Sequence, residues 1–260
     1  MSRPFFDAIE LTRRMREGEP VASGWTAIPA SGTAAALAHG GFQVVCADMQ
    51  HGMHDERSLI DSIQAIHRAG KSPAARVPVG RFDLVSRVLD AGAQFVIAPM
   101  INTEEDARAF AAAAKYPSIG ARSWGPAAAM DLWGVTPREY LQAGNELVVA
   151  LAMIETKQAL HQLDAILAVP GIDGVFVGPS DLSITVSNGG QIDPRDGEVL
   201  RIAREIAVSA RGADKIAGVY AFDVEKGQQF VESGFNFVAI GSDLLALKDF
   251  AGRSSALIPV

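Results

Sequence analysis

Residues 171–183 read GIDGVFVGPSDLS and contain one complete junction between a strand and a helix. The apolar run 174–179 lacks the alternation of a half-exposed strand, so it predicts a strand buried on both faces. The run ends in Gly-Pro, and Ser180 and Asp181 follow it as the start of a helical turn. This stretch therefore predicts a buried parallel strand that leads directly into a helix.

The same unit recurs along the whole chain. Eight short apolar runs, rich in Val, Ile, Phe and Ala, alternate with longer amphipathic stretches. The expected strands are 21–28, 42–48, 74–78, 94–100, 147–155, 174–179, 215–221 and 237–242. The expected helices are 5–17, 55–69, 82–91, 103–114, 159–169, 199–211 and 223–233. Eight such units in about 250 residues match a (β/α)8 barrel in size and in number.

A doubly wound open sheet is the alternative architecture. No G-x-G-x-x-G motif follows the first strand, and the number of units suits a closed sheet better. We therefore predict an α/β protein with a (β/α)8 TIM barrel fold, in which residues 1–260 form a single domain. The long connection 101–146 holds a helix and then GARSWGPAAAMDLWG. Because long connections in compact domains are usually functional, we expect this segment to be a loop of the site.

Composition excludes several classes of protein. Hydrophobic residues make up 48% of the chain and charged residues 20%, which excludes a disordered protein. The single Cys46 excludes a disulfide scaffold. Basic residues number 23 against 30 acidic ones, without a basic stripe, so we expect small-molecule substrates and no nucleic acid. Without an apolar run near the ~20 residues of a membrane span, or a signal peptide, we expect a soluble, cytoplasmic protein with no membrane partner.

Two carboxylates stand at the ends of predicted strands. Glu155 ends the fifth strand and Asp181 follows the sixth. Active sites of such barrels lie at the C-terminal ends of the strands, and an unpaired charge there is costly to bury. A pair of hard oxygen ligands suits Mg²⁺ or a similar divalent ion. The structural alternative is that each acid only caps the helix that follows it.

Three more polar residues reach the same rim. His51 follows Asp48 by three residues, a spacing at which the carboxylate can orient the imidazole as a base. Arg76 lies in a buried strand and needs an anionic partner, such as a substrate oxyanion. The turn at Ser180 and Asp181 offers backbone N–H groups to a carboxylate. Each has a purely structural alternative: His51 only bonds to the backbone of a turn, Arg76 only forms an internal salt bridge, and the turn at Ser180 is only a helix cap.

Lysines are placed unfavourably for Schiff-base chemistry, which needs a lysine on a strand that faces the site. Lys71 and Lys215 precede strands, at the wrong end of the barrel, and only Lys157 lies near the rim. Metal-assisted chemistry is therefore favoured.

Five motifs together resemble a known family. They are DMQHG at 48–52, ARVP at 75–78, LDAGAQ at 89–94, MIET at 153–156 and GIDGVFVGPSDLS at 171–183. The resemblance spans nearly the whole chain and is to the HpcH/HpaI aldolases, the metal-dependent (class II) pyruvate aldolases. It implies reversible aldol cleavage of 4-hydroxy-2-oxoacids (hydroxy ketoacids) to pyruvate and an aldehyde through a metal-stabilised enolate. 4-Hydroxy-2-oxoheptanedioate aldolase is one such enzyme.

The resemblance also implies roles for individual residues. Glu155 and Asp181 match the ligands of a divalent metal ion, Mg²⁺ or Mn²⁺ with Co²⁺ and Zn²⁺ as alternatives. His51 matches the general base and Asp48 its orienting acid. Arg76 matches the residue that steadies the enolate oxygen.

Further positions match residues that support the site. Asp90 matches an acid that raises the basicity of the histidine across a subunit contact. Gly178, Ser180 and Asp181 match the turn that holds the pyruvate carboxylate. The family is usually a homohexamer, a trimer of dimers that exchange their last helices, so the resemblance implies a homo-oligomer.

Two departures concern the substrate. Gln50, a candidate substrate-binding residue, stands where many members have Glu, and Met153 stands where many have a substrate-binding Gln. For the aldehyde end, we expect contacts from the loop around Arg122, Trp124 and Trp133, and from Tyr220 and Phe222 after the seventh strand. Two other functions remain open: a related barrel lyase acting on a CoA ester or a phosphoenolpyruvate-type substrate, and a non-catalytic ligand-binding barrel.

Overall fold

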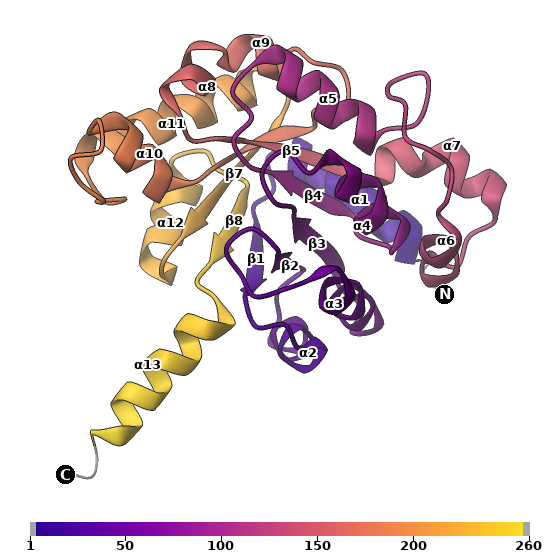
Figure 1. The fold of residues 1–260 in the computed structure, drawn as a ribbon, viewed down its shortest axis with the longest axis horizontal. Helices are drawn as coiled ribbons and strands as arrows, with labels where there is room; N and C mark the ends of the chain where they lie inside the picture. The colour runs from indigo at the N-terminus through magenta and orange to yellow at the C-terminus, as the bar shows by residue number, and fades with distance from the viewer. Residues whose placement is uncertain (1–3, 257–260) are drawn as a thin grey trace.

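A computed structural model describes residues 4–256 (Figure 1). Its eight strands are parallel and form a closed barrel in chain order, with β8 paired to β1. The strands are β1 (Val21–Thr26), β2 (Val44–Asp48), β3 (Ser72–Arg76), β4 (Phe95–Ala98), β5 (Val149–Ile154), β6 (Gly174–Val177), β7 (Ile216–Ala221) and β8 (Phe237–Ile240). The predicted α/β barrel is confirmed. That residues 1–260 form one domain stays a prediction.

Helices surround this barrel. They are α1 (Pro4–Arg16), α2 (Ser31–His39), α3 (Glu56–Arg68), α4 (Phe82–Asp90), α5 (Glu104–Ala114), α6 (Ala127–Trp133), α7 (Pro137–Leu147), α8 (Lys157–His161), α9 (Leu163–Leu167), α10 (Pro179–Val186), α11 (Gly197–Gly212), α12 (Val224–Glu232) and α13 (Asp243–Ser255). The helix expected over 159–169 is two short helices, α8 and α9. The Ala-rich α2 was not predicted, because its sequence has little contrast between polar and apolar faces. Within residues 4–256, no helix combines the length and the apolar character needed to cross a bilayer.

The apolar core lies inside the barrel and between the barrel and its helices. Every residue of β5 is buried, as expected for a parallel strand covered on both sides. Inside the barrel, Phe95 of β4 stacks on Phe237 of β8 with ring centroids 5.3 Å apart. Outside it, aliphatic side chains of the strands and helices form a second cluster.

Helix α1 covers the N-terminal end of the barrel. The residues just before three strands bind to it: the Gln94 amide donates to the Ala8 carbonyl at 2.7 Å, and Asp173 accepts from Arg16 at 2.6 Å. The Asn236 amide donates to the Met15 carbonyl. Helix α1 is thus anchored across this end, which is called the closed end of the barrel below.

Most of the long connection lies at the closed end, and within one chain Arg122, Trp124 and Trp133 do not line the rim cavity; that it forms a loop of the site stays a prediction. Helix α5 packs against α4 and β5, and the chain then passes through α6 and α7 before β5 begins. Phe5 of α1 contacts the rings of Trp133 and Tyr140, with centroids 6.5 and 6.0 Å away. Arg122 and Trp124 contact Tyr116 in the same region and do not line the rim.

Helix α13 leaves the barrel instead of packing on it (Figure 1). Its apolar residues Leu245, Leu247 and Phe250 are exposed, Phe250 by 65%. A groove of about 610 Å³ lies along β8, β1 and α12, lined by apolar residues that include Val21, Val231 and Ile240. This chain therefore has an uncovered side of the barrel and, separately, an uncovered apolar helix.

Candidate active site

A cavity of about 270 Å³ opens at the C-terminal rim of the barrel. It brings together residues predicted from strand ends that are far apart in sequence. Its lining includes Asp48, His51, Arg76, Gly178, Ser180, Asp181, Tyr220 and Phe222, together with Trp25, Met153, Phe176, Ser242 and Leu244. Polar groups and aromatic rings thus share one small cavity, which is typical of a binding site for a small polar molecule.

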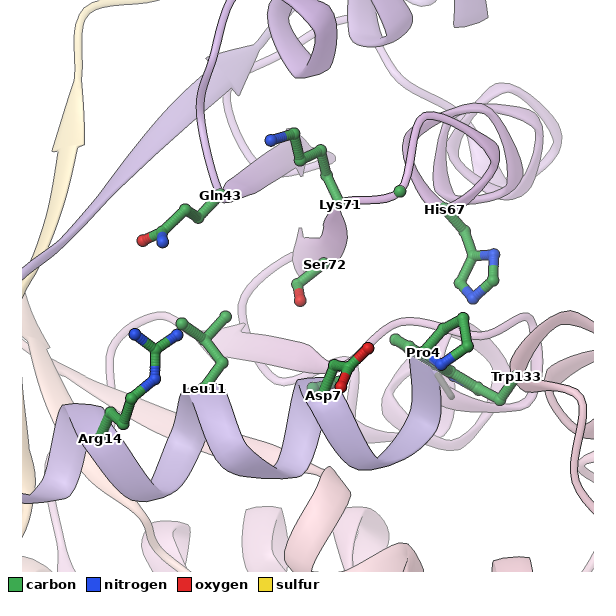
Figure 2. Close-up of a pocket in the computed structure, with 11 residues that line it drawn as sticks. Pro4, Asp7, Leu11, Arg14, Gln43, His67, Lys71, Ser72 and Trp133 are labelled. Atoms are coloured by element: carbon green, nitrogen blue, oxygen red, sulfur yellow. The ribbon is translucent and has the colours of Figure 1, made fainter. Parts of the chain in front are cut away.

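A second cavity, of about 360 Å³, lies at the closed end of the barrel between α1 and the start of β3 (Figure 2). Its charged residues are Asp7, Arg14 and Lys71, and Arg14 is already paired with Glu19 at 2.6 Å. Its lining contains one carboxylate and no pair of them. The rim cavity is therefore the better candidate for chemistry at a metal.

Asp48 and Arg76 form a buried ion pair at the ends of β2 and β3. The guanidinium donates twice to the carboxylate, from Nε at 2.8 Å and from Nη2 at 2.6 Å. Burial raises the pKa of Asp48, but these bonds outweigh it, and the net pKa is lowered. The guanidinium also lies 5.0 Å over the ring of Trp25, whose indole N–H donates to Asp48 at 3.3 Å. Nη1 of Arg76 keeps its N–H groups for an oxyanion.

The pairing expected between Asp48 and the imidazole of His51 is absent. Asp48 instead accepts from the backbone N–H groups of Gln50, at 2.9 Å, and His51, at 3.3 Å. Its carboxylate is thereby committed to Arg76 and to the turn. The His51 side chain is exposed at the cavity, and the part of the chain described gives its ring no hydrogen bond. Asp48 holds the loop that carries His51, while the ring remains free to meet a substrate.

Glu155 is a buried carboxylate with one unpartnered oxygen. It is 1% exposed, and Oε1 accepts from the backbone N–H of Met100 at 2.8 Å. Met100 has a φ of 56°, a left-handed conformation that is uncommon for a side chain of this kind. Burial raises the pKa of Glu155 to about 7, and the nearby Asp181 acts in the same direction. Oε2 has no hydrogen-bond partner among residues 4–256, so a cation is the natural partner for it.

Gly178 leaves the space in front of that oxygen open. A Cβ at this position would lie 2.7 Å from Oε2 of Glu155 and 3.1 Å from Cε of Met153. Asp181 stands half-buried in the first turn of α10 and lines the cavity. The unpartnered oxygen, the open space and two carboxylate donors fit a divalent ion that completes its coordination with water and substrate. No group of three or more His, Cys, Asp or Glu side chains arranged to hold a metal ion by themselves occurs in the described ranges.

The first turn of α10 also offers donors. Pro179 has no N–H, and the N–H groups of Ser180 and Asp181 have no partner within the helix, as at any helix start. Both residues line the cavity. This arrangement can bind a carboxylate next to the position open to a metal.

Comparison with known proteins agrees with this geometry. The model of the HpcH/HpaI aldolase/citrate lyase family matches residues 25–249. The chain belongs to this family. As an HpcH/HpaI protein, it is an enzyme, a lyase of carbon–carbon bonds.

Individual relatives cover most of the chain. A hydroxypyruvate/pyruvate aldolase of Rhizorhabdus wittichii is 36% identical over 231 residues, 89% of this chain and 91% of the relative. A 2-keto-3-deoxy-L-rhamnonate aldolase of Salmonella gallinarum is 35% identical over 246 residues, 94% of this chain and 89% of the relative. The crystal structure of an HpcH/HpaI aldolase from Desulfitobacterium hafniense is 26% identical, with a TM-score of 0.87, covering 96% and 97% of the two chains.

Three predicted site residues do not line the cavity of this HpcH/HpaI chain: Glu155, which is buried beside Gly178, Asp90 and Gln50. Asp90 ends α4, at the N-terminal side of the barrel, and accepts from Nη2 of Arg122 at 2.6 Å. Within one chain it is therefore remote from His51. Gln50 does not line the cavity, and its Oε1 is buried without a partner in the described residues.

The lysines agree with the sequence analysis. Lys157 is exposed on α8, donates to Asn188 at 2.5 Å, and does not line the cavity. Lys115 is buried, but it binds Asp173 at 2.7 Å at the closed end of the barrel. Among residues 4–256, no lysine lines this cavity.

Several cavity residues were missed by sequence reasoning. Trp25 and Phe176 are apolar residues of β1 and β6, which a sequence pattern assigns to the core. Both lie near the C-terminal end of a strand, as Glu155 and Asp48 do, and this position alone could have placed them at the rim. Ser242 and Leu244 come from the start of α13, for which no helix was predicted.

Proposed function

We propose that this protein catalyses the reversible, metal-dependent cleavage of 4-hydroxy-2-oxoacids to pyruvate and an aldehyde. The observation that carries the proposal is the unpartnered, buried oxygen of Glu155, which lies against Gly178, where no Cβ occupies the space, and near Asp181. Arg76 lines the rim cavity together with Asp181, and among residues 4–256 its Nη1 makes no hydrogen bond, while Nε and Nη2 are bound to Asp48. The names of the relatives, which include pyruvate among their substrates, support the same class of reaction.

Binding of the oxoacid follows from the donors available. The substrate carboxylate accepts from the N–H groups of Ser180 and Asp181 in the first turn of α10. The 2-oxo oxygen accepts from Nη1 of Arg76, whose other nitrogens are held by Asp48. A divalent ion bound by Glu155 and Asp181 would supply Lewis-acid stabilisation of negative charge at that oxygen.

Cleavage requires the 4-hydroxyl proton to be removed. His51, exposed at the cavity and free of internal hydrogen bonds, accepts this proton. The C3–C4 bond then breaks: the electron pair left by the proton forms the C=O of the departing aldehyde, and the electron pair of the C3–C4 bond forms the enolate of pyruvate. Arg76 stabilises the enolate oxygen, an interaction worth roughly 3–4 kcal/mol at a preorganised site. Protonation of C3 gives pyruvate, and the reverse path joins pyruvate to an aldehyde.

The proposal is tested by pyruvate release from 4-hydroxy-2-oxopentanoate. We expect activity to be lost in EDTA and restored by Mg²⁺, Mn²⁺, Co²⁺ or Zn²⁺, with Mg²⁺ and Mn²⁺ the expected ions. Glu155→Ala and Asp181→Ala are each expected to abolish the restored activity. Glu225→Gln, an exposed change on α12, is the control. Full activity in EDTA, or a borohydride-trapped pyruvate adduct on a lysine, would refute the metal mechanism. Because relatives are named for hydroxypyruvate, hydroxypyruvate is a second donor to test in the reverse reaction, synthesis with an aldehyde.

Assembly is the second part of the proposal. The exposed apolar residues of α13 and the groove along β8, β1 and α12 are complementary in character. We propose that two chains exchange α13, each helix covering the partner's groove, within a hexamer built as a trimer of dimers. In such an assembly Asp90 would act on the histidine of a neighbouring chain. Light scattering is expected to give six chains, and truncation before Leu245 is expected to lower that number. Cytoplasmic location stays a prediction.

A further inference from the structure

Asp243 is a buried carboxylate near the candidate site that the proposed mechanism does not use. It is 6% exposed at the start of α13. Oδ2 accepts from the Thr26 hydroxyl at 2.6 Å and from the Ile28 N–H at 3.3 Å. Oδ1 accepts from the Ala27 N–H at 2.7 Å and from the Leu244 N–H at 2.8 Å. Four donors from the end of β1 and from α13 thus converge on one side chain.

This carboxylate is not needed as a helix cap. Ser242 already caps α13, because its hydroxyl accepts from the Leu245 N–H at 3.3 Å. An acid in the first turn of a helix usually points to solvent, where it interacts with the helix dipole. Asp243 is instead buried against the end of a different element, β1, and joins α13 to it. The end of β1 is itself tied to the next loop, since Ala27 accepts from the Met53 N–H at 2.8 Å.

The residues on either side of Asp243 form part of the cavity wall. Ser242 and Leu244 both line the rim cavity, next to Tyr220 and Phe222. Beyond Leu244 the helix is exposed on all sides in this chain. Three of the four bonds, those from Thr26, Ala27 and Ile28, join the first turn of α13 and its two wall residues to the end of β1.

We propose that Asp243 is a positioning residue for the acceptor side of the cavity. It fixes Ser242 and Leu244 as the wall that the aldehyde meets, while pyruvate is held on the opposite side by Arg76 and the start of α10. This inference rests on the proposed function. Asp243 fixes both the wall residues and the start of the exposed helix, so a change in the position of α13 would also change the shape of the acceptor side.

Two measurements separate the two sides of the cavity. Exchange of the pyruvate methyl protons with D₂O, followed by NMR with Mn²⁺ removed after incubation, reports enolisation alone. Synthesis from pyruvate and acetaldehyde reports acceptor binding as well. For Asp243→Ala we expect the KM for acetaldehyde to rise about tenfold, as for loss of a charge-assisted hydrogen bond at a mobile wall. We expect the exchange rate to stay within about twofold of wild type, since no donor-side contact is removed.

Two further variants keep the test decisive. Thr26→Val preserves side-chain shape and removes the hydroxyl, whose shortest contact is the bond to Asp243 and whose longer ones are to Ile28, Thr33 and His54. We expect a smaller rise in the same KM, about threefold. Asp249→Asn, an exposed change on the same helix, is expected to alter neither measurement. All variants are compared with the wild type at a protein concentration where light scattering gives each of them the same oligomer mass as the wild type.

The outcomes are distinguishable. An unchanged KM for acetaldehyde in Asp243→Ala, or an equal loss of exchange and synthesis, overturns the positioning role. If Asp243→Ala does not fold, an unchanged KM in Thr26→Val overturns it instead. Absence of metal-dependent exchange in the wild type would overturn the proposed function and this inference with it.

Discussion

Replacing Glu155 by Gln should stabilise the metal-free protein, because the structure holds this carboxylate in a place that disfavours its charge. Burial raises its pKa from an ordinary 4.5 to about 7. A group whose pKa is raised on folding contributes stability below the ordinary pKa and loses it as pH rises through the folded value. Between about pH 4 and pH 8 this pKa shift lowers the free energy of unfolding of the metal-free wild type by about 3 kcal/mol. Gln has nearly the same shape and carries no charge at either pH.

The assay is thermal unfolding in EDTA across this pH range. At pH 8 we expect Glu155→Gln to unfold roughly 5–10 °C above the wild type, and we expect the difference to shrink toward pH 4. The decisive quantity is how the difference in unfolding temperature between Glu155→Gln and the wild type changes with pH. The amide N–H groups of the Gln side chain add a contribution to this difference that does not change with pH. Saturating Mn²⁺ should raise the unfolding temperature of the wild type and leave that of Glu155→Gln unchanged.

The exposed change Glu225→Gln is the control, and it should follow the wild type at every pH. If the unfolding temperature of Glu155→Gln also follows that of the wild type at every pH, burial does not disfavour the charge of Glu155. The inference that its unpartnered oxygen binds a cation is then refuted. A stabilised variant that still responds to Mn²⁺ would place the metal elsewhere.

The remaining predictions concern the same cavity. His51→Ala should lower kcat by roughly 10²–10⁴-fold while calorimetry still detects Mn²⁺ binding; near wild-type kcat would assign the base to another group. Gly178→Ala should lose Mn²⁺ affinity, because its Cβ would lie 2.7 Å from Oε2 of Glu155, and unchanged affinity in calorimetry would show that the ion lies away from that oxygen. Lys157→Ala should retain full pyruvate release, and loss of turnover there would reopen Schiff-base chemistry.

The sequence predicted the barrel because parallel strands buried on both faces need continuous apolar runs, and this requirement leaves a signal within each segment. Strand ends then located Glu155, Asp48 and Arg76 at one rim. Where α6, α7 and α13 lie depends on packing between distant segments, which no local pattern encodes. For that reason the sequence did not place Trp133 at the closed end of the barrel.

The details of hydrogen bonding were also beyond sequence reasoning. The spacing of Asp48 and His51 is compatible with two arrangements, and the choice depends on Arg76, which competes for the same carboxylate from the neighbouring strand. Asp243 resembles an ordinary first-turn acid in sequence. Its burial against β1 follows from the closure of the barrel, which brings residues 217 positions apart into contact.

The position of Trp25 gives the molecule an internal optical reporter. The chain has three tryptophans, and the other two, Trp124 and Trp133, lie at the closed end among the rings that surround α1 and α7. Trp25 alone borders the rim cavity, between a guanidinium and the ring of Phe176. A molecule that enters the cavity changes the polarity around this indole and leaves the other two unaffected. With both distant tryptophans replaced by Phe, the emission spectrum would follow occupancy of the site in real time, without a labelled substrate.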